Sequence, residues 1–133
     1  MSSKIEGRAA ELLNAKNFAV VSTLRADGSV HAVPVWVDLQ EGVPTLNTAE
    51  GRAWPRNLER DPRVTLTVQN LENPYEYVAI RGRVSERTRE GADAHIDALA
   101  GKYLGKAEYP FRQPGEERVI VRVTPEYVHA YGA

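Results

Sequence analysis

Three arginines recur at intervals of four residues in one short segment of the chain: Arg52, Arg56 and Arg60. If residues 51–60 form a helix, this spacing places the three guanidinium groups on one face. Arg52 then lies at the helix N-terminus, beside Thr48 of the preceding turn. Unpaired backbone N–H groups, a hydroxyl and a guanidinium are together suited to a phosphate group. The alternative is a solvated helix whose arginines pair with Glu59 and Asp61.

Most other residue sets that carry chemistry are missing from the sequence. His31, His95 and His129 fall in different predicted elements without the spacing of metal ligands, so we predict no metal site. His31 could pair with a carboxylate in a hydrolytic dyad, but no nucleophile stands out beside it. Neither a Gly-rich phosphate loop nor a Gly-x-Ser-x-Gly motif occurs. We therefore expect any chemistry to come from a bound cofactor, and we assign no catalytic residue.

Length and composition narrow the class of protein. The 133 residues, 42% of them hydrophobic, suit a single domain over residues 1–133 with a real core. The net charge of -1 and the lack of a run of roughly 20 apolar residues predict neither nucleic acid nor a membrane as partner. The absence of cysteine excludes thiol catalysis and disulfides. Together with an N-terminus that lacks a signal peptide, it fits a cytoplasmic protein.

The first half of the chain carries three apolar runs rich in β-branched residues: 18–24, 30–37 and 43–46. The short connections between them contain Asp27-Gly28 and Gly42, which are hairpin signals. Further strands are predicted at 63–69, 75–86, 118–123 and 127–131. The last two are separated by Thr124-Pro125. Six or seven strands with two or three helices predict a mostly β fold, a small antiparallel barrel.

Pro34 is the anomaly in the second of these runs. Both faces of a strand over 30–37 would be largely apolar, as expected for a strand buried on two sides. A proline cannot donate a hydrogen bond to a neighbouring strand. Pro34 therefore marks an edge, a bulge or a place where a ligand replaces a neighbouring strand.

Two further arginines, Arg81 and Arg83, would share one face of the strand over 75–86. Because successive side chains on a strand alternate between faces, residues two apart lie side by side. Two neighbouring guanidinium groups need acids, solvent or an anionic ligand around them. The sequence leaves these three options open.

Three helices are predicted. Residues 3–16 combine the capping-box spacing of Ser3 and Glu6 with an apolar stripe and are expected to plug one end of the sheet. The short helix over 51–60 leaves Trp54 exposed or at an interface. The helix over 89–104 has a core stripe of four residues: Ala92, Ile96, Leu99 and Tyr103. The loop at 106–116, with two prolines and two aromatic residues, is either a lid or a subunit contact.

The order and spacing of several motifs resemble the flavin-binding split-barrel superfamily, which includes the pyridoxamine 5'-phosphate oxidases. The motifs are Val20–Leu24 with Asp27-Gly28, Pro34–Val37, Asn47-Thr48 with Arg52, Arg56–Leu58, and Asp61–Val64. Within this superfamily, the pattern is most similar to the deazaflavin (coenzyme F-420)-dependent oxidoreductases. The resemblance runs from residue 18 to the end of the chain and is densest between residues 18 and 82.

The resemblance implies a split β-barrel that forms a homodimer, with two cofactor sites at the subunit interface. It implies that residues 33–36 run beside the cofactor ring and that Tyr77 reaches the ring from the second subunit. The phosphate and its neighbouring groups would be held by four residues: Asn47, Thr48, Arg52 and Arg56. The residues assigned to cofactor binding are Val33, Pro34, Val35, Trp36, Asn47, Thr48, Arg52, Trp54, Arg56, Asn57 and Tyr77. Many relatives have a phosphate-contacting lysine where this chain has Trp54, whose indole is a single neutral donor.

The function implied by the resemblance is an oxidoreductase. Reduced coenzyme F-420 would pass a hydride to an electron-poor double bond of a small molecule, such as an enone, a quinone or a bilin. Water or one of three tyrosines would supply the proton: Tyr77, Tyr109 or Tyr127. The alternatives are an FMN-dependent enzyme with the same site, a non-catalytic flavin- or deazaflavin-binding protein, and a cofactorless dimer.

Overall fold

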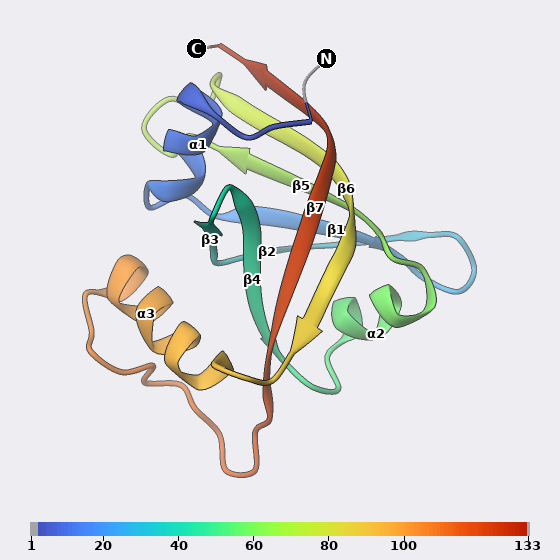
Figure 1. Ribbon diagram of the computed structural model, residues 1–133, viewed down its shortest axis with the longest axis vertical. Coiled ribbons are helices and arrows are strands. Elements are labelled where there is room, and N and C mark those ends of the chain that lie inside the picture. The colour runs from blue at the N-terminus through green and yellow to red at the C-terminus, as the bar shows by residue number, and fades with distance from the viewer. Residues whose placement is uncertain (1–2, 133) are drawn as a thin grey trace.

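The computed structural model describes residues 3–132, which form one seven-stranded antiparallel sheet curled into an open barrel (Figure 1). The strands are β1 (Ala19–Leu24), β2 (Val30–Val35), β3 (Val37–Gln40), β4 (Val43–Ala49), β5 (Arg63–Gln69), β6 (Tyr77–Thr88) and β7 (Arg118–Tyr131). Their order across the sheet is β2-β1-β5-β6-β7-β4-β3. The predicted mostly β fold with six or seven antiparallel strands is confirmed.

The predicted strand over 30–37 is in fact two strands. β2 ends at Val35 and pairs with β1 at one edge of the sheet, whereas β3 begins at Val37 and pairs with β4 at the other edge. The chain therefore changes edges at Trp36. The expectation that both faces of this strand are buried is wrong, because the side chains of β2 are exposed or half-buried. Pro34 lies in an edge strand, where a missing N–H is tolerated.

β7 runs without a break through Thr124 and Pro125, so the prediction of two separate C-terminal strands is wrong. It pairs with β6 along one side and with β4 along the other. Its register with β6 shifts at Gly82, where a Cβ atom would lie 2.2 Å from the carbonyl oxygen of Thr124. Only glycine allows this close approach of two backbones. The shift leaves Glu126 without a register partner on β6, as in a β-bulge.

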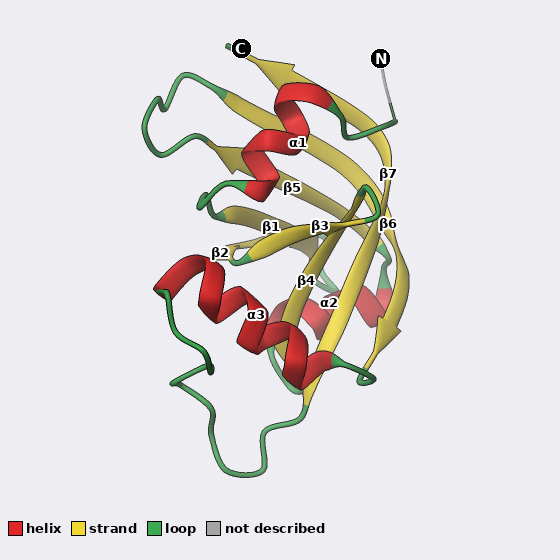
Figure 2. Cartoon of the chain, turned by 60° about the vertical axis from the view of Figure 1, so that its left-hand side comes forward, coloured by secondary structure: helices red, strands yellow, loops and turns green. Residues whose placement is uncertain are grey.

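Helix α1 (Gly7–Asn14) covers one end of the barrel, as predicted (Figure 2). Its apolar stripe is buried, with Leu12 and Leu13 at most 2% exposed. The predicted capping box is wrong, because the helix begins at Gly7 and its N-cap, Glu6, makes no side-chain cap hydrogen bond. An ion pair ties the helix to the sheet instead: Arg8 donates to the carboxylate of Glu76 through Nε at 2.6 Å and Nη2 at 2.7 Å.

Helices α2 (Ala53–Arg60) and α3 (Ala92–Leu104) lie toward the other end of the barrel (Figure 1). Pro55 falls in the first turn of α2, where its missing N–H breaks no helical bond. The predicted core stripe of α3 is confirmed, since its four residues are at most 2% exposed. Gly105 ends the helix with a left-handed φ of 69°.

The barrel encloses a core that draws on α1, on α2 and on strands from both halves of the sheet. Its largest fully buried side chains include Leu12, Leu13, Leu46, Leu66 and Ile80, whereas Leu99 lies in a separate cluster under α3. No helix within residues 3–132 combines the length and apolar character that crossing a membrane requires.

Candidate functional site

A cavity of about 320 Å³ opens where β2 gives way to β3, between the N-terminus of α2 and the loop that precedes β7. We call it the aromatic pocket. Its lining residues are Phe18, Pro34, Val35, Trp36, Asn47, Arg52, Trp54, Ile96, Tyr109, Phe111 and Arg118. The fold thus brings together six of the residues predicted to bind a cofactor: Pro34, Val35, Trp36, Asn47, Arg52 and Trp54.

One wall of the aromatic pocket is a ladder of aromatic rings. Trp36 stacks on Tyr103 with centroids 5.2 Å apart and planes 6° from parallel. Phe18 stacks on the same tyrosine at 5.4 Å. Tyr109 meets Trp36 edge-on at 5.9 Å, and Phe111 in turn meets Tyr109 at 5.7 Å. Such arrangements suit the charge distribution of aromatic rings and leave flat apolar surface in the pocket.

The tyrosine at the centre of this ladder is fixed by its hydroxyl. Tyr103 Oη donates to the carbonyl of Asn17 at 2.5 Å and accepts the N–H of Val37 at 3.2 Å. Burial raises the pKa of Tyr103 to about 12. The neighbouring Lys102 ammonium donates to the carbonyl of Val37, and burial lowers its pKa to about 8 against the opposing effect of Asp38. The ladder is therefore anchored where β3 begins.

The opposite side of the pocket is a buried polar network centred on Arg118. Its side chain is 3% exposed and that of Glu116 is 6% exposed. Arg118 donates through Nε to Oδ1 of Asn47 at 2.9 Å and through Nη1 to Glu116 at 2.5 Å. Burial alone would raise the pKa of Glu116, but hydrogen bonds from the Gln113 N–H and from Arg118 hold it below its usual value. The guanidinium is thus held in place by two side chains.

The network continues through Asn47 to a histidine with a defined tautomer. Because Arg118 donates to Oδ1 of Asn47, the amide nitrogen must be the group that donates to the Ala92 carbonyl at 2.9 Å and to His95 Nδ1 at 3.0 Å. Nδ1 then accepts, so the ring proton lies on Nε2, which donates to Asp38 at 3.0 Å. Every hydrogen bond in this chain runs in the same direction, from Arg118 to Asp38.

The N-terminus of α2 borders the pocket with unsatisfied groups. Arg52 is the N-cap residue and provides no side-chain cap; its guanidinium is 53% exposed and lies 3.7 Å from Glu116. The hydroxyl of Thr48 is buried and has no hydrogen-bond partner in the described part of the chain. Trp54 is 4% exposed, so the prediction that it is exposed or at an interface is wrong. Its side chain packs in the core and lines the pocket.

Three other residues predicted to bind a cofactor lie apart from the pocket lining. Val33 is half-buried and packs against the core. Arg56 is exposed on α2. Asn57 is buried and donates to Thr23 at 3.1 Å while it accepts from Arg60.

The alternative ion pairs proposed for the helix arginines are not those observed. Glu59 contacts Arg87 at 3.2 Å and Asp61 contacts Arg63 at 2.7 Å. The acids next to this helix are therefore paired with residues of β5 and β6.

Tyr77 lines a second depression, of about 450 Å³, on the outer face of β1 and β5. This depression shares Phe18 and Pro34 with the aromatic pocket. The two cavities therefore meet at the edge strand β2.

Sequence reasoning assigned no binding role to four residues in or beside the pocket: Glu116, Arg118, His95 and Phe111. One signal could have pointed to Arg118, which opens a run of apolar residues and so brings a charge into a buried strand. Its partner Asn47 is 71 residues away, and no local pattern identifies such a pair. Among residues 3–132, the structure has no group of three or more potential ligands that could hold a metal ion.

Comparison with known proteins identifies the family to which the sequence belongs. The sequence profile of the pyridoxamine 5'-phosphate oxidase family matches residues 5–132. Among solved structures, an F420 reductase is 25% identical, with a TM-score of 0.78 over 90% of this chain and 94% of the other. A conserved hypothetical protein of Mycobacterium tuberculosis, Rv2991, is 21% identical, with a TM-score of 0.75 over 98% of this chain and 88% of the other.

A third structure, the protein Atu2129 of Agrobacterium tumefaciens, is also 21% identical, with a TM-score of 0.75 over 94% of this chain and 55% of the other. A search of the curated proteins found no match. The family profile covers nearly the whole chain, and the superfamily resemblance inferred from the sequence motifs is confirmed. This chain belongs to the pyridoxamine 5'-phosphate oxidase family.

Proposed function

We propose that this protein is an oxidoreductase that binds coenzyme F-420 in the aromatic pocket and reduces an electron-poor double bond of a small molecule, such as an enone, a quinone or a bilin. When bound, the coenzyme supplies the hydride. The observation that carries the proposal is a single pocket that joins an aromatic wall to an uncapped helix N-terminus bearing Arg52. The similarity to an F420 reductase supports the choice of coenzyme.

The residues present fit such a group. A flat ring needs apolar surface, which the aromatic ladder offers, and polar partners at its edge. Residues 34–36 leave the sheet at an edge strand, so their backbone is open to a ligand on its outer side. A phosphate needs N–H groups and a cation, which the start of α2 and Arg52 provide.

The protein's own contribution is to orient the coenzyme and the substrate, to exclude water from the pocket and to provide a proton to the substrate. Aromatic side chains line much of the pocket, and a ring bound against them would displace water, which strengthens charge interactions beside it. Of the three tyrosines considered as proton donors, Tyr109 lines the aromatic pocket, Tyr77 lines the neighbouring depression and Tyr127 lines neither. Tyr109 is therefore our choice. Its ring lies 5.1 Å from the Arg118 guanidinium.

A homodimer and an FMN-dependent reaction belong to the same proposal. Tyr77 and the outer depression it lines face away from the barrel core, so a second copy covering this face would bring its own residues to the shared edge at Pro34. FMN is the alternative cofactor, because it presents the same combination of flat ring and phosphate.

The deciding experiment is a titration of the purified protein with coenzyme F-420 and FMN side by side, followed by fluorescence. We expect tighter binding of coenzyme F-420. Reduced coenzyme is then mixed with a panel of enones, quinones and bilins, and its oxidation is measured. Binding without oxidation of the reduced coenzyme across the panel would indicate storage rather than catalysis. Tighter binding of FMN would transfer the proposal to that cofactor.

The phosphate contact is tested by Arg52→Ala, with Arg60→Ala at the far end of the same helix as a matched control. Loss of a charge-assisted hydrogen bond weakens binding by about 1.5–3 kcal/mol, or roughly 10- to 150-fold. We expect that loss for Arg52→Ala and unchanged affinity for Arg60→Ala. Equal affinity in the two variants would remove the phosphate site from the start of α2.

A further inference from the structure

The aromatic pocket holds a buried arginine for which the proposed phosphate contact has no use. Arg118 lines the pocket from the start of β7, and its side chain is 3% exposed. Arginine is almost never buried unless its charge and its N–H groups have partners. The partners of each nitrogen of Arg118 therefore show what this side chain does in the pocket.

Three contacts hold the guanidinium group of Arg118. Nε donates to Oδ1 of Asn47 at 2.9 Å, and Nη1 donates to Glu116 at 2.5 Å. The guanidinium carbon lies 5.1 Å from the ring centroid of Tyr109, a cation–π contact. The Asn47 amide is itself fixed, because its nitrogen donates to the Ala92 carbonyl at 2.9 Å. The guanidinium group is therefore held in one orientation before any ligand arrives.

The third nitrogen of this group, Nη2, is left without a partner. It makes no hydrogen bond to any residue between 3 and 132. The buried side-chain nitrogen and oxygen atoms that lack a partner in this range are His31 Nδ1 and Thr48 Oγ1, so Nη2 keeps some accessible surface. Because Arg118 lines the aromatic pocket, this surface belongs to the pocket. Two N–H groups of a fixed cation are thus available to a ligand there.

The charges beside the pocket leave one positive charge uncompensated. Arg52 and Arg118 are the cations of its lining. Among residues 3–132, Glu116 is the one carboxylate within 4.0 Å of either of them, at 2.5 Å from Arg118 and 3.7 Å from Arg52. Two guanidinium groups therefore share one carboxylate. This balance suits a ligand on which a single negative charge lies or develops.

We propose that Nη2 of Arg118 is an oxyanion site, which binds the oxygen of a conjugated carbonyl compound as that oxygen becomes negative. The proposal rests on the proposed reduction of an electron-poor double bond and deepens it. A hydride that adds to the far carbon of an enone forms a C–H bond there, and the electron pairs of the C=C and C=O bonds shift so that the oxygen becomes the anion of an enolate. The neighbouring carbon then takes up a proton, which restores the carbonyl group. Donors that are fixed before this charge forms stabilise it without reorganisation.

The surroundings of Nη2 fit a substrate of this class. Trp36 and Phe111 line the same pocket and offer apolar surface to a flat conjugated body. Tyr109, chosen above as the proton donor, lies against the same guanidinium group. The oxygen that becomes negative and the group that supplies the proton would therefore meet on one side of the substrate. A double bond without a conjugated oxygen would leave Nη2 without a partner and should be a poor substrate.

The test uses 4-nitrophenol, because its phenolate is a flat conjugated anion like an enolate and absorbs at a longer wavelength than the neutral phenol. The purified full-length protein, without coenzyme, is titrated into the probe at fixed pH. 4-Nitroanisole has the same ring without an ionisable oxygen and measures the contribution of the aromatic wall alone. We expect the phenolate to bind roughly tenfold or more tightly than the anisole, and the phenolate fraction to rise on binding.

Two variants and a control assign this preference to Arg118. Arg118→Gln combined with Glu116→Gln removes the cation together with its counter-charge, so no buried charge is left unpaired. It should lose the roughly tenfold preference for phenolate and bind the anisole as wild type does. Glu116→Gln alone keeps the guanidinium group and should bind the phenolate more tightly. Arg122→Gln, on the same strand but outside the pocket lining, where Arg122 pairs with Glu86, should match wild type.

Equal binding of phenolate and anisole by wild type would overturn the proposal, and so would a double variant that keeps the preference. Loss of the preference in Arg52→Ala, with retention in the double variant, would place the anion at the start of α2 instead. Failure of the coenzyme to bind in its own titration would remove the proposed reduction and leave the oxyanion site in place. Coenzyme binding without a phenolate preference would do the reverse, so the two proposals fail separately.

Discussion

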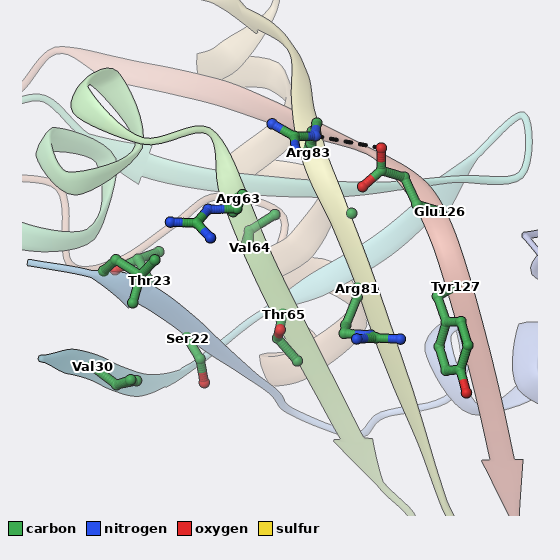
Figure 3. A pocket seen from close by; sticks show the side chains of 12 residues that line it. Ser22, Thr23, Val30, Arg63, Val64, Thr65, Arg81, Arg83, Glu126 and Tyr127 are labelled. Carbon is green, nitrogen blue, oxygen red and sulfur yellow. Dashed lines mark ion pairs between the residues drawn. The ribbon is translucent and has the colours of Figure 1, made fainter. Parts of the chain in front are cut away.

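The aromatic pocket and a second cavity, of about 460 Å³ over the outer face of β1, β5 and β6 (Figure 3), each present an arginine, and the two arginines are held in opposite ways. Arg118 is 3% exposed and is enclosed by Glu116 and Asn47. Arg81 is exposed and rests on one aromatic ring. The first is part of the buried network beside β4 and β7, whereas the second makes a single ring contact at the surface. Removing a buried charge that has partners costs far more stability than removing an exposed one.

The largest expected effect that tests this comparison is on stability. Arg118→Met removes the guanidinium that neutralises the buried Glu116 carboxylate and bonds Oδ1 of Asn47, which should lower the free energy of unfolding by about 3–5 kcal/mol. Arg81→Met, in contrast, should change it by no more than about 0.5 kcal/mol. Urea denaturation of both variants measures the difference. Similar losses in the two would mean that Arg81 is structural as well.

A smaller difference is expected between two tyrosines. Tyr103→Phe removes the hydroxyl that bonds the Asn17 carbonyl and the Val37 N–H, so both buried groups lose a partner. The expected loss is about 1–3 kcal/mol. Tyr127→Phe keeps the ring beneath Arg81 and should change stability by less than about 0.5 kcal/mol. Thermal unfolding of the pair checks the prediction, which fails if the two variants melt alike.

Alkaline pH should act on the aromatic pocket through the same residue. The pKa of Tyr103 is raised to about 12 in the folded protein from 10 in the unfolded chain. The folded state then binds the proton more tightly, so this contribution to stability is present below pH 10 and is lost as the pH rises from 10 to 12. Denaturation curves across this range should show a decline that is weaker in Tyr103→Phe. An identical decline in both proteins would contradict the assignment.

The smallest expected effect concerns an ion pair on the same outer face as Arg81. Arg83 and Glu126 are 3.4 Å apart and about half exposed, so their pairing contributes less than about 1 kcal/mol. Glu126→Gln should therefore lower the free energy of unfolding by no more than that amount, and the difference should disappear at high salt. Urea denaturation at low and high salt measures it. A larger loss that persists at high salt would show that Glu126 has a structural role beyond this pair.

Local patterns predicted most of the fold. The strand over 63–69 was predicted with its observed bounds, because Val64, Leu66 and Val68 alternate with polar residues. The stripe of α3 follows from its periodicity in the same way. The sequence does not indicate that one strand ends and another begins at Trp36, because apolar residues lie on both sides of it. Pro125 was read as a break, although the bulge beside it lets β7 continue.

The site was predictable only where its residues follow one another along the chain. Residues 34–36 and Arg52 lie in short motifs, and the structure gathers them in one pocket. Arg118 reaches that pocket because β7 pairs with β4, which brings Val119 opposite Thr48 and Ile120 opposite Asn47. Pairing over such a separation depends on the whole sheet, so the sequence carries no local sign of it. Whether the predicted residues bind a cofactor is left to the titrations proposed above.

The position of β7 in the sheet has a consequence for how the barrel folds. Within the described residues, this strand joins β6 to β4, so the two parts of the sheet remain unjoined until β7 pairs on both of its sides. The facing edges of β6 and β4 stay unpaired until that step, and an unpaired strand edge is a template for association with another chain. Substitutions that slow the pairing of β7 are therefore expected to favour aggregation during folding.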